Sequence, residues 1–387
     1  MEKIRILQSI RQGKIGGGER HVLDLVNYLD KDRFEPVVLS FTDGEMIESL
    51  KDMNVETHVL KTEKPFDVRI WKSVAKLTHK LNVDLIHSHG TRACSNCYWT
   101  AKKLNISSLY TIHGWSFHPN QNFFVQKIRE KCERFLTKQT NLNILVSNGN
   151  LEEGVQKLGI NNSIVIKNGV NLDVFNINQI VNDHSDFRSQ IGVKEDELLV
   201  GLIARITVQK DPITFIKAAE RVITENKKIK FLIVGDGEMK RKSIEYAKAK
   251  NIEDKCIFLD FRSDVPAILK AIDIYCLPSL WEGLPIGIIE AMAMGKPIVA
   301  TAITGTIELV HHRDNGILFP IKNHIRLAES ILELASNHTL RVEMGIKSRM
   351  KVEEEYDIKK MVKDVEKVYE SVYQDKLVKA KTQLVNV

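Results

Sequence analysis

Residues 274–301 read IYCLPSLWEGLPIGIIEAMAMGKPIVAT, and this stretch carries the clearest signal for the fold of the chain. A short apolar run ends at Pro278, the loop that follows carries Glu282, and a helix-like run bears Glu290. A Gly-Lys-Pro turn then leads into a second apolar run that ends at Thr301. Two buried runs joined by one helix are typical of neighbouring parallel strands with a helix on the face of their sheet.

The same alternation of short apolar runs and amphipathic segments extends along the whole chain. Amphipathic segments such as 19–29 and 72–81 predict helices. The predicted strands are 4–10, 36–41, 57–60, 83–87, 107–112, 142–147 and 164–166, followed by 198–204, 230–234, 256–259, 272–277, 297–301 and 316–319. This pattern predicts an α/β fold with parallel sheets covered by helices on both faces, which bind ligands at the carboxyl ends of their strands.

The strand pattern divides the chain of 387 residues into two domains. Residues 1–170 and 196–355 each predict a doubly wound, Rossmann-like domain, and the two sheets are expected to face each other across a central cleft. The polar segment 171–195 is expected to be the inter-domain connection with one short helix. The charged tail, 356–387, predicts a helix that crosses back to the first domain.

The net charge of +6 is confined to the first half of the chain. Residues 1–170 hold 24 Lys and Arg against 18 Asp and Glu, whereas residues 171–387 hold 32 of each kind. A basic half suggests an anionic partner such as a membrane surface, a lipid phosphate or a nucleic acid. A solvated surface without such a partner is the alternative.

Composition also predicts a cytoplasmic protein. No apolar run approaches the roughly 18 residues needed to span a membrane. Lys and Arg interrupt the first residues too often for a signal peptide, and five Cys in a chain of this length do not predict a disulfide framework.

Two groups of residues at predicted strand ends suit phosphate binding. Gly16, Gly17 and Gly18 precede an amphipathic helix, where backbone N–H groups can approach an anion, although Gly-rich turns are common. Arg205 and Lys210 follow the first strand of the second domain. Two cations there suit a diphosphate leaving group, whereas the alternative is a solvated loop.

The acidic and histidine residues point to a ligand site without a metal. Glu290 lies among apolar residues, and a carboxylate in such company usually has a partner. His113 ends a strand and either contacts a ligand or is an ordinary strand-end histidine. Cys94 and Cys97 lie near His87, His89 and His113, but the spacing is short and no second Cys pair follows, so we expect no metal site.

These motifs together resemble glycosyltransferase family 4, the retaining glycosyl transferases group 1, which have the GT-B fold. The resemblance covers essentially the whole chain, and the ordered set is more specific than any one motif. The matching pieces occur in the family's order: IGGGERHVLDL, IHSHGT, YTIHGW, LVSNGN, IKNGVNLDVF, ARITVQKDP, LIVGDGE, the stretch 274–301 and NGILFP.

The resemblance implies retaining transfer of a sugar from a nucleotide-sugar, a UDP-sugar above all, without a bound divalent metal. It implies that Arg205 and Lys210 hold the diphosphate and that His113 contacts the donor sugar. It also implies that Glu282, with the backbone after it, meets the sugar hydroxyls and that Glu290 binds the ribose. The residues with implied backbone roles at the donor or acceptor are Gly16, Gly17, Gly283 and Leu284.

Three departures from the family pattern are small. Gly18 replaces an Ala, Asn171 replaces the Asp of the hinge motif, and Asp211 replaces the Gly that often follows the lysine. By analogy, the first domain binds a glycan or lipid-linked acceptor in surface polysaccharide or glycolipid biosynthesis, and the second domain binds the donor.

Two other functions remain open at this stage. One is a UDP-N-acetylglucosamine 2-epimerase, which uses the same architecture and would change the donor without any acceptor. The other is a non-enzymatic nucleotide-binding module. The neutral second half and the low aromatic content of 7% argue against nucleic acid as a partner.

The segment 122–138 predicts a helix that could contact an anionic membrane surface. It places three apolar residues, Phe124, Ile128 and Phe135, at helical spacing. The cations around them are Lys127, Arg129, Lys131, Arg134 and Lys138. We expect a peripheral position at the inner face of the membrane if these apolar residues are exposed, and no such position if they pack into the core.

Overall fold

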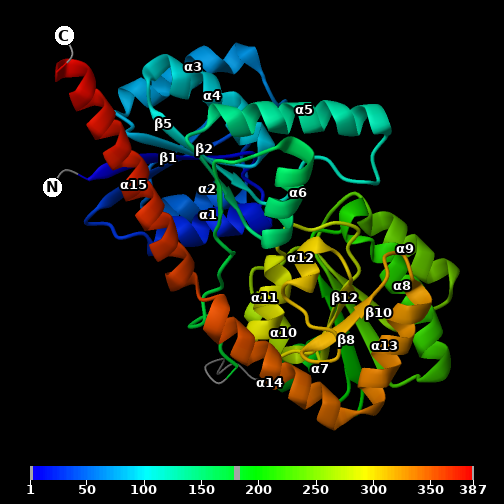
Figure 1. Ribbon diagram of the computed structural model, residues 1–387. Coiled ribbons are helices and arrows are strands. Elements are labelled where there is room, and N and C mark those ends of the chain that lie inside the picture. Colours follow the sequence, from blue (N-terminus) through cyan, green and yellow to red (C-terminus); the bar gives the residue numbers. More distant parts are fainter. Residues whose placement is uncertain (1–2, 178–183, 386–387) are drawn as a thin grey trace. The chain divides into compact units, whose positions relative to one another are not determined.

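The computed structural model describes residues 3–177 and 184–385, and the chain divides into two compact units. The first unit consists of Met1–Gly169 together with Ile358–Val387, and the second is Val170–Asp357. Figure 1 shows a sheet with helices on its faces in each unit. The sequence analysis predicted the corresponding domain boundaries after residues 170 and 355.

The first unit contains a seven-stranded parallel sheet in the order β3-β2-β1-β4-β5-β6-β7. Its strands are β1 (Ile4–Ile10), β2 (Phe34–Ser40), β3 (Thr57–Val59), β4 (Leu85–His89), β5 (Ser107–Ile112), β6 (Leu142–Leu145) and β7 (Ser163–Val165). Its helices are α1 (Gly17–Tyr28), α2 (Glu45–Asp52), α3 (Val68–Lys80), α4 (Thr91–Leu104), α5 (Phe123–Gln139), α6 (Asn148–Leu158) and α15 (Ile358–Val385).

The last helix, α15, is part of the core of the first unit. Val365 and Tyr369 of α15 are buried in one hydrophobic cluster with Ile6 of β1, Leu25 of α1 and Phe34 of β2. Figure 1 shows this helix running across the sheet of the first unit. The C-terminal helix therefore covers a sheet built from the N-terminal half of the chain.

The second unit contains a six-stranded parallel sheet in the order β10-β9-β8-β11-β12-β13. Its strands are β8 (Leu198–Ile203), β9 (Ile229–Val234), β10 (Cys256–Leu259), β11 (Ile274–Leu277), β12 (Ile298–Thr301) and β13 (Gly316–Phe319). Its helices are α7 (His184–Gln190), the 3-10 turn η1 (Val208–Lys210), α8 (Pro212–Glu225), α9 (Lys240–Ala249), α10 (Val265–Ala271), α11 (Ile286–Ala293), α12 (Thr304–Ile307), α13 (His324–Ser336) and α14 (His338–Glu355).

The segment 171–195, expected to be the connection, belongs to the second unit where it is described. Its helix α7 packs on α10, and the Arg188 guanidinium donates to the carbonyl of Ala271 at 2.7 Å. Residues 178–183 of this segment lie outside the described residues.

Both sheets reverse their strand order in the middle, and this point places the candidate site. The chain runs outward from β1 to β3 and then returns to add β4 on the other side of β1. In the second sheet, β8 and β11 have the same relation. Loops after the two central strands diverge there, so they leave a crevice at the carboxyl edge in which ligands of such sheets bind. Among the described residues, none of the helices combines the length and apolarity needed to span a bilayer.

Candidate functional site

In the second unit, a glycine turn holds the loop that carries Arg205. The N–H of Ile206 donates to the carbonyl of Asp236 at 2.8 Å, and the N–H of Met239 donates to the carbonyl of Ile206 at 2.9 Å. Gly235 has a φ of +134°, and a Cβ on it would stand 2.0 Å from the carbonyl oxygen of Ala204. Only glycine permits this approach, so the GDGE turn fixes the backbone beside Arg205.

Lys210 ends the turn η1, and Asp211 starts the helix after it. Asp211 has a φ of +45°, a left-handed conformation that Asp tolerates better than most residues. Its carboxylate accepts hydrogen bonds from the N–H of Thr214 at 3.3 Å and from the Thr214 hydroxyl at 2.6 Å. Asp211 therefore adopts the left-handed backbone conformation that the Gly of the family pattern can also adopt. In addition, its side chain caps the N-terminus of α8.

The loops after β8 and β11 are joined by an ion pair between Lys210 and Glu282. The Lys210 ammonium contacts Oε1 of Glu282, and the two side chains are only 15% and 7% exposed. Gln209 strengthens this junction with two hydrogen bonds. Its side-chain N–H₂ donates to the backbone carbonyl of Trp281 at 2.8 Å, and its backbone carbonyl accepts from the N–H of Leu280. Lys210 and Glu282, which were predicted separately from the sequence, thus lie together beside the switch point of the second sheet.

Glu290 lies in α11 and is partly buried near the hydroxyl of Tyr275. Burial raises the pKa of Tyr275 well above its usual value, and the negative charges of Glu290 and Glu282 raise it further. The Tyr275 hydroxyl donates to the carbonyl of Ile203 at 3.2 Å. A Cβ on Gly287 would stand 2.6 Å from that hydroxyl, so glycine lets α11 begin against β11.

The structure also shows what fixes Gly283 and Leu284, which the sequence singled out. Both are buried, and a Cβ on Gly305 would stand 2.0 Å from the carbonyl oxygen of Gly283. The short helix α12 is thus pressed against this loop. The sequence analysis missed Tyr275, Gly287 and Gly305. A glycine inside an apolar helical run was the available signal for Gly287.

In the first unit, the Gly-rich turn leads directly into α1. Gly16 is the N-cap of this helix, so no cap side chain covers its first N–H groups. A Cβ on Gly18 would stand 3.4 Å from Cδ2 of His113, an ordinary contact distance. The first turn of α1 therefore lies against His113, and an Ala at position 18, as the family pattern has, would fit.

Four histidines gather at the switch point of the first sheet, and His113 is one of them. Its Nε2 lies 3.2 Å from Nδ1 of His89, which ends β4, and its ring packs edge-on against His21 of α1. Burial lowers the pKa of His21 to about 4 and that of His87 to about 3, and it holds those of His89 and His113 well below their usual value. All four imidazoles are neutral at pH 7. The sequence analysis did not single out His21.

Comparison with known proteins identifies the family. The family described as Glycosyltransferase Family 4 matches residues 15–174, and the family described as Glycosyl transferases group 1 matches residues 183–351. The chain belongs to the group 1 glycosyltransferases of family 4. It is therefore a glycosyltransferase.

Individual relatives of this glycosyltransferase agree with that assignment. Escherichia coli UDP-Gal:alpha-D-GlcNAc-diphosphoundecaprenol alpha-1,3-galactosyltransferase is 28% identical over 381 residues, which cover 95% of this chain and 97% of the relative. Bacillus anthracis N-acetyl-alpha-D-glucosaminyl L-malate synthase is 25% identical over 80% of this chain and 81% of its own length. The crystal structure of Anabaena HepE in complex with UDP and glucose matches with a TM-score of 0.84 at 22% identity, over 95% of this chain and 100% of that chain. The GT-B fold predicted from the sequence is confirmed.

The Cys94-x-x-Cys97 pair of this glycosyltransferase is structural. Both thiols are free and buried, and each packs into a different hydrophobic cluster of the first unit. Burial raises the pKa of Cys97 to about 11 and that of Cys94 well above its usual value. The thiolate is the form in which cysteine binds a metal ion, so burial disfavours metal binding by this pair.

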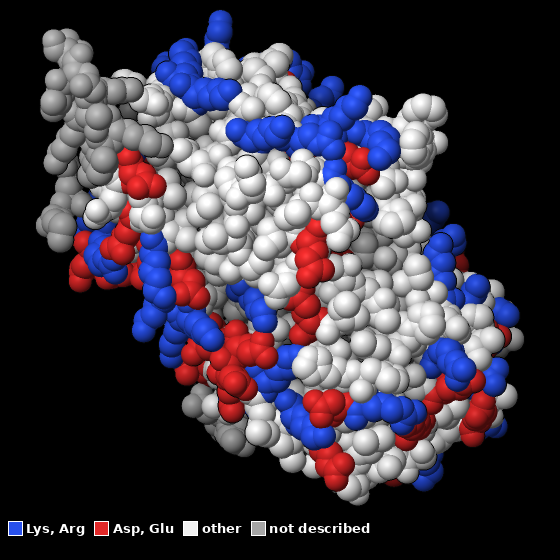
Figure 2. All heavy atoms as spheres, in the orientation of Figure 1, with Lys and Arg blue, Asp and Glu red and all other residues white. Residues whose placement is uncertain are grey.

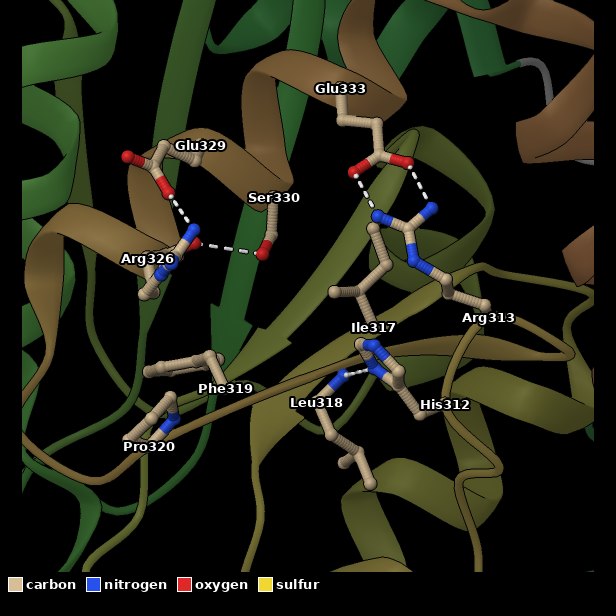
Figure 3. Close-up of a pocket in the computed structure, with 10 residues that line it drawn as sticks. All are labelled: His312, Arg313, Ile317, Leu318, Phe319, Pro320, Arg326, Glu329, Ser330 and Glu333. Carbon is tan, nitrogen blue, oxygen red and sulfur yellow. Dashed lines mark hydrogen bonds and ion pairs between the residues drawn. The ribbon is translucent and has the colours of Figure 1, made fainter.

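A cavity of about 280 Å³ at the free edge of the second sheet is separate from the candidate site (Figure 3). It lies between β13 and α13, and none of the predicted site residues lines it. Arg313 makes two hydrogen bonds to Glu333, and Arg326 makes one to Glu329. This cavity also lies away from the switch point of the second sheet, where ligands of such sheets bind, so it is a poor candidate for the donor site.

Proposed function

We propose that this enzyme is a retaining hexosyltransferase that moves a sugar from a UDP-sugar to a lipid-linked glycan during surface polysaccharide or glycolipid assembly. The observation that carries the donor half of the proposal is the Lys210–Glu282 pair at the switch point of the second sheet. The E. coli relative, whose name specifies UDP-Gal and a diphosphoundecaprenol acceptor, supports the choice of substrates.

In this proposal, Arg205 and Lys210 stabilise the charge that grows on the diphosphate as the glycosidic bond breaks. Fixed cations aimed at developing charge are the usual means of lowering such a barrier. When the donor binds, the Lys210 ammonium gains the diphosphate as a partner in addition to Glu282. The Glu282 carboxylate then turns toward the sugar hydroxyls. Glu290 accepts hydrogen bonds from the ribose hydroxyls.

Three further predicted site residues, Gly16, Gly17 and His113, belong to the first unit, whereas Gly283 and Leu284 belong to the second. His113 contacts the donor sugar, and the uncapped N–H groups at Gly16 and Gly17 meet a phosphate of the donor or the acceptor. Arg205 and Lys210 supply the positive charge that a bound metal ion would otherwise supply. Catalysis therefore needs no divalent metal, and EDTA should leave the rate unchanged.

The acceptor half of the proposal rests on α5. Phe124, Ile128 and Phe135 are 74%, 62% and 40% exposed, so none of the three is buried in the core, which was the alternative left open by the sequence. We call the outward residues of this helix the α5 face: Phe124, Lys127, Ile128, Lys131, Phe135 and Lys138. The opposite side is buried and consists of Glu130, Glu133, Leu136 and Thr137. Figure 2 shows Lys and Arg gathered along α5 with little acidic surface among them.

Aromatic rings continue the α5 face onto the neighbouring helices. Phe135 packs against Phe66 and Tyr98, and Trp71 stacks on Trp99 with their ring centroids 5.9 Å apart. Rings with one apolar and one polar end favour the boundary between lipid and water. An anionic bilayer attracts nearby cations by about 1 kcal/mol each. This surface therefore suits a peripheral position on the membrane that carries a lipid-linked acceptor.

The test combines donor binding with transfer. Purified protein is screened by thermal shift against UDP-, GDP- and ADP-sugars, and a donor at 100 times its Kd should stabilise it by about 2.7 kcal/mol. The stabilising donor is then incubated with a sugar diphosphate on a short polyprenol and, separately, with a small soluble acceptor such as malate. Transfer with retention of configuration to the polyprenol substrate supports the proposal.

Each other outcome assigns a different function. A new nucleotide-sugar formed without any acceptor indicates an epimerase. Donor binding without chemistry indicates a binding module, and transfer only to the soluble acceptor removes the lipid-linked half of the proposal.

A further inference from the structure

Three imidazole nitrogens face one another at the carboxyl edge of the first sheet. They belong to His21 of α1, His89 at the end of β4 and His113 after β5, and they all lie within 4.8 Å of one another. Nδ1 of His89 and Nε2 of His113 are 3.2 Å apart. Two nitrogens bound to the same tetrahedral Zn²⁺ at about 2.0–2.1 Å would be about 3.3 Å apart. The distance between the nitrogens of His89 and His113 therefore already suits a zinc site.

Hydrogen bonds on the far side of two of these rings leave an unprotonated nitrogen of each ring facing the other histidines. The Nδ1–H of His21 donates to the side-chain oxygen of Asn168 at 3.2 Å, which leaves its Nε2 without a proton. The Nε2–H of His89 donates to the side-chain oxygen of Gln8 at 2.9 Å, which leaves its Nδ1 without a proton. Metal-bound histidines are usually oriented in this way, by an outward N–H that donates to an oxygen.

The lone pair of His21 is not satisfied by the protein. His21 is only 4% exposed, and among the residues that the structure describes none forms a hydrogen bond to its Nε2. If Nε2 of His113 carries a proton, it can donate to Nδ1 of His89, but it cannot also donate to Nε2 of His21. A buried acceptor without a partner is costly in free energy, and a ligand that accepts electron pairs from all three rings would remove that cost.

The electrostatics of the site favour neutral ligands at physiological pH. Burial keeps the pKa values of the three imidazoles low, so a metal ion would displace no proton from His21 or His89. The positive charge of Arg11 also lowers the pKa of His113, but Arg11 is 3.4 Å from the carboxylate of Glu19, which partly balances that charge. His113 is partly exposed, so a fourth position is open to water.

We propose that His21, His89 and His113 form a binding site for one borderline transition-metal ion, with Zn²⁺ as the probe. Imidazole nitrogens suit Zn²⁺, Cu²⁺ and Ni²⁺ better than Mg²⁺ or Ca²⁺, which prefer oxygen. To complete the site, His21 moves toward the other two rings. This inference stands independently of the proposed sugar transfer, which uses no metal.

The test is titration of tag-free, metal-depleted protein with ZnCl₂ by calorimetry, in the absence of any sugar donor. One Zn²⁺ should bind per chain. His21→Ala should weaken this binding at least tenfold, whereas the matched control His79→Ala, which removes an exposed histidine of the same unit, should leave it unchanged. Lack of saturable binding, or equal binding by His21→Ala, overturns the site.

A pair of substitutions at Asn168 separates coordination from a structural effect. Asn168→Leu removes the oxygen that orients His21 and should weaken Zn²⁺ binding about 10–100-fold. Asn168→Asp keeps an oxygen at that position and should retain the affinity. If both variants bind Zn²⁺ as the unaltered protein does, His21 is not a ligand and the proposal fails.

Activity assays distinguish this proposal from the proposed role of His113. If His113 contacts the donor sugar, loading with Zn²⁺ removes it from the donor and inhibits transfer, and EDTA restores the rate. Zn²⁺ that binds with the expected dependence on His21 but does not inhibit would leave the metal site intact and contradict the donor role of His113.

Discussion

The two sheets have related strand orders, but they end in chemically different loops at the switch point. In the second unit, the loops after β8 and β11 meet through the charged pair Lys210–Glu282. In the first unit, the corresponding region between β1 and β4 holds neutral imidazoles that are buried beside α1. Topology therefore decides where a ligand binds, whereas the loop residues decide which chemistry each domain can offer.

The difference also has an energetic side. A charged pair that is mostly removed from water is retained at a cost in desolvation, which a diphosphate can offset when it binds. Buried histidines avoid that cost because they lose their proton. The second unit thus holds a charged pair at its switch point, whereas the first unit holds neutral imidazoles.

The largest effect is expected for the charged switch point. Lys210→Ala removes a cation that stabilises the leaving diphosphate, so kcat should fall about 10²–10³-fold, with a smaller change in KM for the donor. Steady-state kinetics with the donor identified by thermal shift measures both. The control is Lys217→Ala, a lysine of α8 in the same unit, which should leave kcat unchanged. A rise in KM alone would make Lys210 a binding residue with no part in bond breaking.

A smaller effect, on binding, is expected for Glu290. Glu290→Ala removes an acceptor of two ribose hydrogen bonds, and the loss of even one hydrogen bond to a charged group costs roughly 1.5–3 kcal/mol. The Kd for the donor should rise about 10–150-fold, and Glu290→Gln should recover part of it. Isothermal titration with UDP alone checks this. Unchanged UDP affinity in a folded Glu290→Ala protein would contradict the ribose assignment.

Acid should weaken the first unit more than the second. The pKa values of His21 and His87 fall from 6.5 to about 4 and about 3 on burial, so the unfolded chain binds more protons below pH 6.5. The free energy of unfolding is therefore highest above pH 6.5 and falls as the pH drops, by at most about 1.4 kcal/mol per pH unit for each histidine. The described residues of the second unit include no buried histidine.

Hydrogen exchange at pH 7.5 and pH 5 measures this difference unit by unit. Peptides from the first sheet should lose more protection at pH 5 than peptides from β8–β13. His87→Gln removes one titrating group and should flatten the dependence in the first unit. An equal loss in both units would mean that the buried histidines do not control acid stability.

The smallest effect is expected at the surface, where the first unit alone carries the excess positive charge. Replacing Lys127, Lys131 and Lys138 with Glu should abolish co-sedimentation with liposomes that contain anionic lipid, because each cation contributes about 1 kcal/mol. Binding by the unaltered protein should be weak, reversible and lost at high salt. Donor binding should not change.

A matched variant changes the net charge by the same amount elsewhere. Lys227, Lys242 and Lys248 are exposed lysines of the second unit, and replacing them with Glu should leave liposome binding intact. Loss of binding in both triple variants would indicate a response to net charge rather than to the α5 face. No co-sedimentation of the unaltered protein at low salt would end the membrane proposal.

Most of the fold could be predicted from the sequence because buried parallel strands are continuous apolar runs. The strands β1, β5, β10 and β13 have the same limits in the structure as in the sequence analysis. Strand ends were also informative, since the chemistry of an α/β sheet lies at its carboxyl edge. That rule and the family motifs led to the prediction of Arg205, Lys210 and Glu282 as site residues.

Contacts between distant residues were not available from local patterns. The pairing of Lys210 with Glu282 joins positions 72 residues apart, and the hydroxyl of Tyr369 reaches His87 at 2.7 Å across 282 residues. From the sequence, His21 was only one residue of the predicted amphipathic helix 19–29. Only the ring contacts of His21 with His89 and His113 show that this face of α1 meets the histidines at the strand ends.

The sequence by itself determined the fold class, the approximate positions of the strands and the residue types near the strand ends, because hydrophobic periodicity and turn chemistry are local properties of the chain. The tertiary structure alone decided which of these residues meet and which protonation states they keep. Desolvation and pairing depend on the surroundings of a group in space, and those surroundings come from segments far apart in the sequence.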